Sequence, residues 1–367
     1  MTHRLVLALV LLAASPALAH NPGDPPHQTF AMGDLKLESG EVIKDFTISY
    51  VTHGTLNAKK SNVILMVTAL TGNHHRLDFL IGPGKALDTT KYFVVATDAI
   101  GNGLTTSPSN SKAQPRMQFP KFAMRDMVES QRRLLKDKLG IDHVVAVIGP
   151  SMGGMQALQW GVSHPDVMDS LVALVPLART PAWSVLLVEA TRKAIMLDPA
   201  WNNGNYTSIP VNGVRLWREI LGFGAARTPE MYRDQFANPL DVLPWLKAQE
   251  DAVLSVFDPN DYIYQSWAYE SHDVGATPGM SRDYAKALRA IKAKTLIMTG
   301  VKDLLNPEWE PLEAARHIRD VRTVTISPES VTGHFAAGGF RPADVEHINA
   351  EVAKFLDVVT RGGERLR

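Results

Sequence analysis

Short apolar runs recur along the chain and are separated by helical or loop stretches. The runs are rich in Val and Ile and are bounded by turn-forming residues; they lie at 63–67, 92–97, 144–148, 171–175, 295–299 and 323–326. Runs of this kind are typical of strands buried on both faces of a sheet. Helical patterns lie between them, over 124–139, 152–162 and 309–318. The alternation of strand and helix predicts an α/β fold with a mostly parallel sheet flanked by helices.

The alternation stops between Leu177 and Arg289. This stretch contains five of the seven tryptophans and helical patterns over 183–197, 214–223, 240–257 and 261–272, with no convincing strand. We therefore predict a core formed by 20–176 and 290–367, with an inserted helical cap, or lid, over 177–289. Binding sites favour such domain junctions. A packed helical layer without a gating role is the alternative that the sequence leaves open.

The first nineteen residues have the pattern of a cleaved secretory signal. A basic start at His3 and Arg4 precedes the apolar run 5–14, and Ala17 and Ala19 frame a small-residue cleavage site. The apolar run is too short to cross a bilayer. We expect cleavage near Ala19–His20 and an exported protein, periplasmic or secreted, with no membrane association after cleavage. An uncleaved anchor or a buried helix is the alternative. Residues 21–27, with three prolines and a glycine, are predicted to form a flexible leader.

Composition excludes several classes of function. The chain has 38 basic and 38 acidic side chains and no long basic run, so nucleic acid is not an expected partner. The absence of cysteine excludes disulfides, thiolate metal sites and a thiol nucleophile. Neither an H-E-x-x-H motif, a P-loop nor a G-x-G-x-x-G motif after a strand occurs, so we expect no metal and no nucleotide cofactor. The expected ligand is a small molecule.

A Gly-x-Ser-x-Gly motif occupies 149–153, between a predicted strand and a predicted helix. The turn is so tight that side chains at Gly149 and Gly153 would clash, and it lifts the Ser151 hydroxyl above the sheet at the N-terminus of the helix. The sequence predicts Ser151 as the nucleophile and the Met152 N–H as a donor to a developing oxyanion. The alternative is a glycine-rich turn in which the serine only caps the helix.

A serine hydroxyl needs a base and an orienting acid, which in this motif follow the serine in the order acid, then histidine. Asp303 follows the run 295–299, and His334 follows the run 323–326, so both are predicted to complete a catalytic triad. A second oxyanion donor is needed from the loop after an early strand, and the Leu70 N–H is the candidate. An ordinary turn there is the alternative. The residues considered as rivals or as further substrate contacts are Asn73, His74, His75, His164, His272, His317, Asp320 and His347.

Several longer motifs occur in order: TALTG at 68–72, GPGKALDT at 82–89, RDMV at 125–128, SMGGMQAL at 151–158 and DPAW at 198–201. With these motifs the chain, from about residue 30 to 360, resembles the homoserine O-acetyltransferase family of α/β-hydrolases. The resemblance implies the α/β-hydrolase fold, a covalent acyl-enzyme, a helical cap and often a homodimer formed through that cap. Carried over by position, it gives Ser151, Asp303, His334 and the oxyanion pair Leu70 and Met152.

Departures from the family bear on the substrate. In the family an aspartate directly after the catalytic histidine holds homoserine, whereas Phe335 follows His334 here. A cap arginine also contacts homoserine in the family, and Arg218 is the candidate match; Ala225 stands at the place of a family tyrosine. Arg218 and Phe335 are therefore the candidate substrate-binding residues.

The predicted function combines the motifs, the departures and export. Acetyl-CoA is scarce outside the cytoplasm, so water is the expected acyl acceptor, and the sequence predicts an exported serine esterase acting on a small carboxylic ester. The first alternative is an O-acyltransferase of the homoserine O-acetyltransferase type, which passes the acyl group to an alcohol or amine. The second is a non-catalytic binding module on the same fold, because a fold does not guarantee a function.

Overall fold

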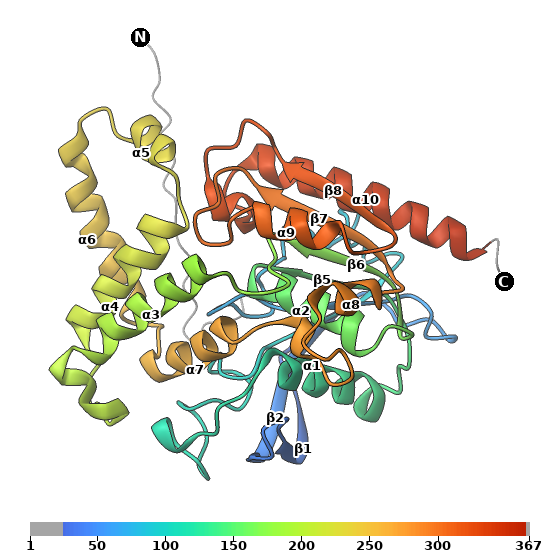
Figure 1. Cartoon of the computed structure of the whole chain (residues 1–367), viewed down its shortest axis with the longest axis horizontal. Helices are drawn as coiled ribbons and strands as arrows, with labels where there is room; N and C mark the ends of the chain where they lie inside the picture. Colours follow the sequence, from blue (N-terminus) through green and yellow to red (C-terminus); the bar gives the residue numbers. More distant parts are fainter. Residues whose placement is uncertain (1–24, 365–367) are drawn as a thin grey trace.

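The computed structural model describes residues 25–364, so the predicted signal segment lies outside the described part of the chain. An eight-stranded sheet forms the centre, with the strand order β1-β2-β4-β3-β5-β6-β7-β8 (Figure 1). The strands from β4 to β8 in this order run parallel; they are β3 (Val63–Met66), β4 (Phe93–Thr97), β5 (Val144–Pro150), β6 (Met168–Leu174), β7 (Lys294–Gly300) and β8 (Val321–Ile326). The predicted mostly parallel sheet is confirmed.

A long hairpin forms one edge of the sheet. Strand β1 (Gln28–Lys36) pairs antiparallel with β2 (Val42–His53), which in turn pairs antiparallel with β4. The prediction of a flexible leader reaching to residue 27 is wrong at its end, because the His27 Nε2 lies 3.3 Å from the Asp98 carboxylate at the end of β4. The buried Asp98 carboxylate is therefore a partner for His27 in the segment that precedes β1.

Helices cover both faces of the sheet. Side chains of β3 alternate, so that Val63 and Leu65 join one apolar cluster and Ile64 and Met66 join the other. The first cluster includes residues of α1 (Met124–Arg133), its π-helical continuation η3 (Leu134–Lys138), α2 (Met152–Ser163), α8 (Tyr284–Arg289) and α9 (Trp309–Ala315). The second includes α10 (Pro342–Glu364). Each fully buried Val, Leu or Ile stabilises this three-layer arrangement by about 1.5–3 kcal/mol.

The chain between β6 and β7 is helical and gathers beside the sheet (Figure 1). Its main elements are α3 (Ala182–Met196), α4 (Val211–Trp217), η5 (Arg218–Ala225), α5 (Pro229–Gln235), α6 (Val242–Val253) and α7 (Pro259–Glu270), with short turns η4 (Pro199–Gly204), η6 (Pro239–Asp241) and η7 (Val274–Ala276). This region, called the cap below, has an apolar cluster of its own. Leu70 and Leu305, from loops of the sheet domain, pack against that cluster, so the cap covers the loops at the carboxyl ends of the strands.

Within residues 25–364 no helix combines the length and the apolar character that a membrane crossing needs.

Candidate active site

Ser151 stands in the sharp turn between β5 and α2 with φ 56° and ψ −120°. This backbone conformation is strained for a residue other than glycine, and such strain is concentrated at functional sites. The turn has no space for side chains on either side, because a Cβ at Gly153 would lie 2.5 Å from the Val67 carbonyl oxygen and one at Gly149 would lie 2.5 Å from the Gly153 carbonyl carbon. The Ser151 N–H donates to the Leu174 carbonyl at 2.8 Å. The hydroxyl is thereby held at the N-terminus of α2.

Asp303, His334 and Ser151 form one hydrogen-bonded chain. The His334 Nε2 lies 2.8 Å from the Ser151 Oγ, and the His334 Nδ1 lies 2.7 Å from an Asp303 carboxylate oxygen. All three residues are buried, with 5%, 4% and 5% of their surface exposed for Ser151, Asp303 and His334. A carboxylate that accepts the Nδ1 proton leaves Nε2 as the acceptor for the serine proton. The structure brings together the three residues that the sequence proposed.

The loops that carry Asp303 and His334 are themselves fixed. The second carboxylate oxygen of Asp303 accepts from the backbone N–H groups of Leu305 at 2.9 Å and Asn306 at 2.8 Å. His334 lies in the turn η8 (Gly333–Gly338), and the next backbone N–H, that of Phe335, donates to the Ala226 carbonyl of the cap at 3.3 Å. The position of the imidazole therefore depends on both the sheet domain and the cap.

The Leu70 and Met152 N–H groups remain candidates for the oxyanion hole. Neither donates a hydrogen bond to any of residues 25–364. Their segments touch, because the Gln156 side chain of α2 donates to the Thr68 carbonyl at 3.0 Å. An N–H without an internal partner is available to a ligand oxygen.

The oxyanion loop is also clamped from the cap. Thr71 has φ 56°, and its N–H donates to the Oε1 of Gln265 on α7 at 2.9 Å. Sequence reasoning missed Gln265, because the helical pattern predicts α7 but carries no signal that one of its side chains reaches a loop 194 residues earlier. The only signal in the sequence is the amide side chain of Gln265 within a mostly apolar helical pattern, and this signal does not identify the partner.

The rival histidines do not contact Ser151. His272 is buried, and its carbonyl accepts a hydrogen bond from the Thr180 N–H. Burial, aided by the nearby charge of Arg125, lowers the pKa of His272 to about 3. Burial likewise lowers the pKa of His164, at the end of α2, to about 4. Of the other candidates, His317 is 3.6 Å from Glu313, His347 is in α10, Asp320 precedes β8, and Asn73, His74 and His75 lie in the loop after β3.

The two candidate substrate residues lie on facing segments of the cap and the sheet domain. Arg218 opens η5, with its guanidinium carbon 5.1 Å from the centre of the Phe223 ring. Phe335 packs edge-on against Phe340 with ring centres 5.0 Å apart, and its ring centre lies 4.7 Å from the guanidinium carbon of Arg227. Arg227 was not singled out from the sequence. The signal available was a cation directly after the mostly apolar stretch 220–226.

A second histidine and carboxylate cluster lies beside the oxyanion loop. Ligand atoms of His27, His74 and Asp98 lie within 4.8 Å of one another, an arrangement able to hold a metal ion. Asp98 already accepts hydrogen bonds from the Ser49 hydroxyl at 2.5 Å and the His74 N–H at 3.0 Å. Burial acts to raise the pKa of Asp98, but the hydrogen bonds from His27, His74 and Ser49 together outweigh burial and hold it well below its ordinary value. The cluster anchors the loop after β3.

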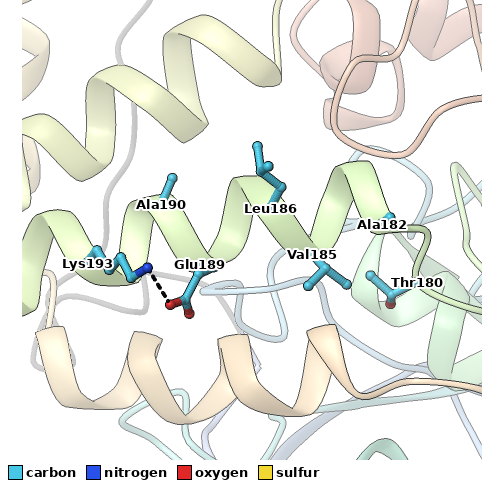
Figure 2. Close-up of a pocket in the computed structure, with 7 residues that line it drawn as sticks. All are labelled: Thr180, Ala182, Val185, Leu186, Glu189, Ala190 and Lys193. Carbon is cyan, nitrogen blue, oxygen red and sulfur yellow. Dashed lines mark ion pairs between the residues drawn. The ribbon is translucent and has the colours of Figure 1, made fainter.

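A surface hollow of about 580 Å³ lies along α3 (Figure 2). Its lining residues are Thr180, Ala182, Val185, Leu186, Glu189, Ala190 and Lys193. Lys193 pairs with Glu189 at 3.2 Å, as the dashed line shows. Since none of the triad residues contributes to the lining, the hollow is not the candidate active site.

Comparison with known proteins supplies independent evidence. A family model described as alpha/beta hydrolase fold matches residues 62–336. A homoserine O-acetyltransferase of Methanosalsum zhilinae is 34% identical over 361 residues, which cover 89% of this chain and 72% of that protein. An acetylester hydrolase from Corynebacterium glutamicum has a similar solved structure, with a TM-score of 0.84, 28% identity and coverage of 90% and 96% of the two chains. A homoserine O-acetyltransferase from Bacillus anthracis has a TM-score of 0.80, 27% identity and coverage of 90% and 97%.

Proposed function

Because the chain belongs to the homoserine O-acetyltransferase family of α/β-hydrolase-fold enzymes, we propose that it forms an acyl-enzyme at Ser151 and hydrolyses carboxylic esters. The observation that carries the proposal is the buried hydrogen-bonded chain from Asp303 through His334 to Ser151, with distances of 2.7 and 2.8 Å. A serine with an oriented base is an activated nucleophile. This hydrogen-bonded triad also argues against a non-catalytic binding module, because such a module does not need a strained serine at this turn.

The proposed reaction has two halves. His334 Nε2 takes the proton of Ser151 as the Oγ attacks the ester carbonyl, and the N–H groups of Leu70 and Met152 stabilise the oxyanion that forms. The ester C–O bond then breaks, and the leaving alcohol takes its proton from His334. In the second half His334 takes a proton from water, the hydroxide attacks the acyl carbon, and the Ser151 oxygen leaves and recovers its proton. Each oxyanion donor contributes about 2.7–4 kcal/mol to the lowering of the barrier.

Water is the proposed acceptor because of the residue beside the imidazole. By the family resemblance, an aspartate at position 335 would hold the homoserine acceptor, and a phenylalanine has no charge for an ammonium group. The ring of Phe335 instead faces the guanidinium of Arg227. A cation at this place also repels the ammonium group that the family aspartate would hold.

A second candidate function is O-acetyl transfer to homoserine, and the sequence comparison favours it. The Methanosalsum zhilinae relative is named for that activity, and so is one of the similar solved structures. On sequence identity alone this candidate is better supported than hydrolysis, whereas the Corynebacterium glutamicum structure bears the name of an ester hydrolase. Both candidates share the acyl-enzyme and differ only in the acceptor.

One experiment separates the two acceptors. The purified protein is incubated with acetyl-CoA and homoserine, and in parallel with 4-nitrophenyl acetate, with and without homoserine; free acetate and O-acetylhomoserine are quantified. Hydrolysis predicts acetate from the nitrophenyl ester and no homoserine-dependent product. O-acetylhomoserine as the main product would establish transfer instead. The Ser151→Ala variant is the control, and equal rates for it and the wild type would refute both candidates.

We also propose that the mature chain is exported, begins near His20 and pairs through its cap. The sequence pattern of residues 1–19 supports export. Leu240 and Leu243 support pairing, since 69% and 58% of their surfaces are exposed on the cap. The intact molecular mass of the protein recovered from a periplasmic or medium fraction tests export and the cleavage site. Light scattering of the wild type beside a Leu240→Glu, Leu243→Glu variant tests the second, and a wild-type monomer would contradict it.

A further inference from the structure

A buried carboxylate beside the loop after β3 has only histidines as ion-pair partners. Asp98, which directly follows β4, has none of its surface exposed. Its ion-pair partners within residues 25–364 are His27 and His74, and no lysine or arginine of this range pairs with it. An imidazole has a charge only when it is protonated, so neither histidine is a permanent counter-ion. A buried negative charge is costly unless it is paired or binds a metal ion.

Three side chains converge on one oxygen of the Asp98 carboxylate. This oxygen, Oδ2, lies 2.5 Å from the Ser49 hydroxyl, 2.9 Å from the His74 Nδ1 and 3.3 Å from the His27 Nε2. The Ser49 hydroxyl also contacts the His27 Nε2. A carboxylate oxygen has about two lone-pair sites, so three hydrogen-bond donors compete for them. A cation at the centre of the cluster would instead accept electron pairs from each of the surrounding atoms.

The separations between these atoms suit a tetrahedral metal site. Zinc binds imidazole nitrogen and carboxylate oxygen at about 2.0–2.1 Å, which places neighbouring ligand atoms about 3.3 Å apart. The ligand atoms of His27, His74 and Asp98 lie within 4.8 Å of one another, and the two imidazole ring centres are 4.9 Å apart. Small side-chain movements therefore suffice to surround an ion. A water or the Ser49 hydroxyl would complete the four ligands.

Further hydrogen bonds hold these side chains in place. The other carboxylate oxygen of Asp98, Oδ1, accepts from the His74 N–H and from the Asn102 side-chain amide, both at 3.0 Å. The same amide nitrogen of Asn102 donates to the Gly72 carbonyl at 3.1 Å. Outer partners of this kind orient the ligands of a metal site. They also connect the cluster with the loop that contains Leu70.

We propose that His27, His74 and Asp98 bind a divalent transition-metal ion, with zinc as the best fit. Two imidazole nitrogens and one carboxylate oxygen favour zinc over magnesium and calcium, which prefer oxygen ligands. The His27 side chain is 27% exposed, so the ion has access from solvent. The ion fixes the segment before β1 to the loop after β3, whichever acceptor receives the acyl group.

The expectation of no metal from the sequence was based on short motifs, in which the ligands lie a few residues apart. In this cluster His74 lies 24 residues from Asp98, and His27 lies 71 residues from it. The three ligands therefore come from three separate segments, which only the folded chain brings together.

Zinc binding is measured on the full chain without a polyhistidine tag, after bound metals have been removed with dipicolinate. The wild type is expected to bind one zinc ion with a Kd below about 10 μM in calorimetry, a weak value for a structural zinc site. Elemental analysis after gel filtration is expected to give one zinc per chain. Magnesium is expected not to compete, because it dehydrates reluctantly and favours oxygen ligands.

Variants connect zinc binding with the cluster. In His27→Gln the affinity is expected to fall at least about tenfold, since even the loss of an outer partner costs about 10- to 100-fold. His27 precedes β1 and is partly exposed, so the variant keeps the core intact. The matched control is His143→Gln, because His143 forms an exposed pair with Asp169 at 2.9 Å, and its zinc affinity stays at the wild-type value. A zinc ion held by His334 would be retained in His27→Gln.

Hydrogen exchange and thermal unfolding test whether the ion holds the two segments. Zinc is expected to slow amide exchange in residues 25–36 and 68–76 and to raise the Tm of the wild type, with neither effect in His27→Gln. A wild-type Kd above about 10 μM would overturn the proposal. So would an affinity in His27→Gln that is within about tenfold of the wild-type value.

Discussion

The backbone N–H of Thr71 donates to the side-chain Oε1 of Gln265 at 2.9 Å, and this bond joins the oxyanion loop to a helix of the cap. The Nε2 of the same amide donates to the Ile100 carbonyl at 3.1 Å, so the side chain is held from both ends. Leu70, the proposed oxyanion donor, directly precedes Thr71. The cap thus contributes to the geometry of the site as well as covering it.

Replacing Gln265 with Leu is expected to lower kcat about 10- to 100-fold with little change in KM, because a displaced Leu70 N–H stabilises the oxyanion less well. Gln265→Glu keeps an acceptor for the Thr71 N–H and is expected to recover part of the rate. Steady-state kinetics with 4-nitrophenyl acetate measure both variants. An unchanged kcat in Gln265→Leu would contradict a positioning role.

Asp303→Asn is expected to reduce kcat about 10³- to 10⁴-fold while the fold persists. The amide group retains the shape of the carboxylate but favours the wrong tautomer of His334, so that Nε2 no longer accepts the serine proton. The steady-state rate of ester hydrolysis gives kcat, and circular dichroism checks the fold. A loss of less than tenfold would show that His334 does not need this partner.

His272 predicts a dependence of stability on pH. Its folded pKa of about 3 lies below the ordinary histidine value of about 6.5. Above pH 6.5 the residue is neutral in both states; below it only the unfolded chain takes up the proton, so stability falls by roughly 1.4 kcal/mol per pH unit until about pH 3. Replacing His272 with Gln removes this contribution.

The free energy of unfolding in urea, measured at pH 7.5, 6.5 and 5, checks the effect of His272. The wild type is expected to lose roughly 2 kcal/mol more than His272→Gln between pH 6.5 and 5. His164, which is partly buried and also has a lowered pKa, is unchanged in both proteins and cancels in the comparison. Parallel pH profiles would contradict the prediction.

Asp98→Asn is expected to destabilise the protein by about 3 kcal/mol at pH 7, because the carboxylate is buried among hydrogen-bond donors. The folded pKa of Asp98 is depressed, so its contribution is complete above about pH 4 and is lost as the pH falls through the folded value. Thermal unfolding at pH 7 and pH 3 tests this. A difference between the two proteins that grows at pH 3 would be the opposite of the expected sign.

The fold could be predicted from the sequence because its central strands are buried on both faces. Runs such as 63–67 and 144–148 can be read without knowledge of their neighbours, since both sides of the sheet require apolar residues. The edge hairpin was less visible. Strand β1 has one partly exposed face and contains Gly33 at a register shift, so its alternation is interrupted.

The candidate triad was also readable, because its order and its places after strands follow from the fold. The residues that were missed act through long-range contacts. Gln265 and Arg227 acquire their meaning from loops far away in sequence, the first through Thr71 and the second through Phe335. A local pattern contains no such information. The end of the expected leader was wrong for the same reason, since His27 has its partner at Asp98.

The most direct test of the central claim is the intact mass of the protein after treatment with a fluorophosphonate, followed by peptide mapping. The account predicts a single adduct on the Ser151 hydroxyl, together with complete loss of ester hydrolysis and no adduct in Ser151→Ala. An unmodified wild type, or an adduct that persists in Ser151→Ala, would contradict the claim that His334 and Asp303 activate this serine.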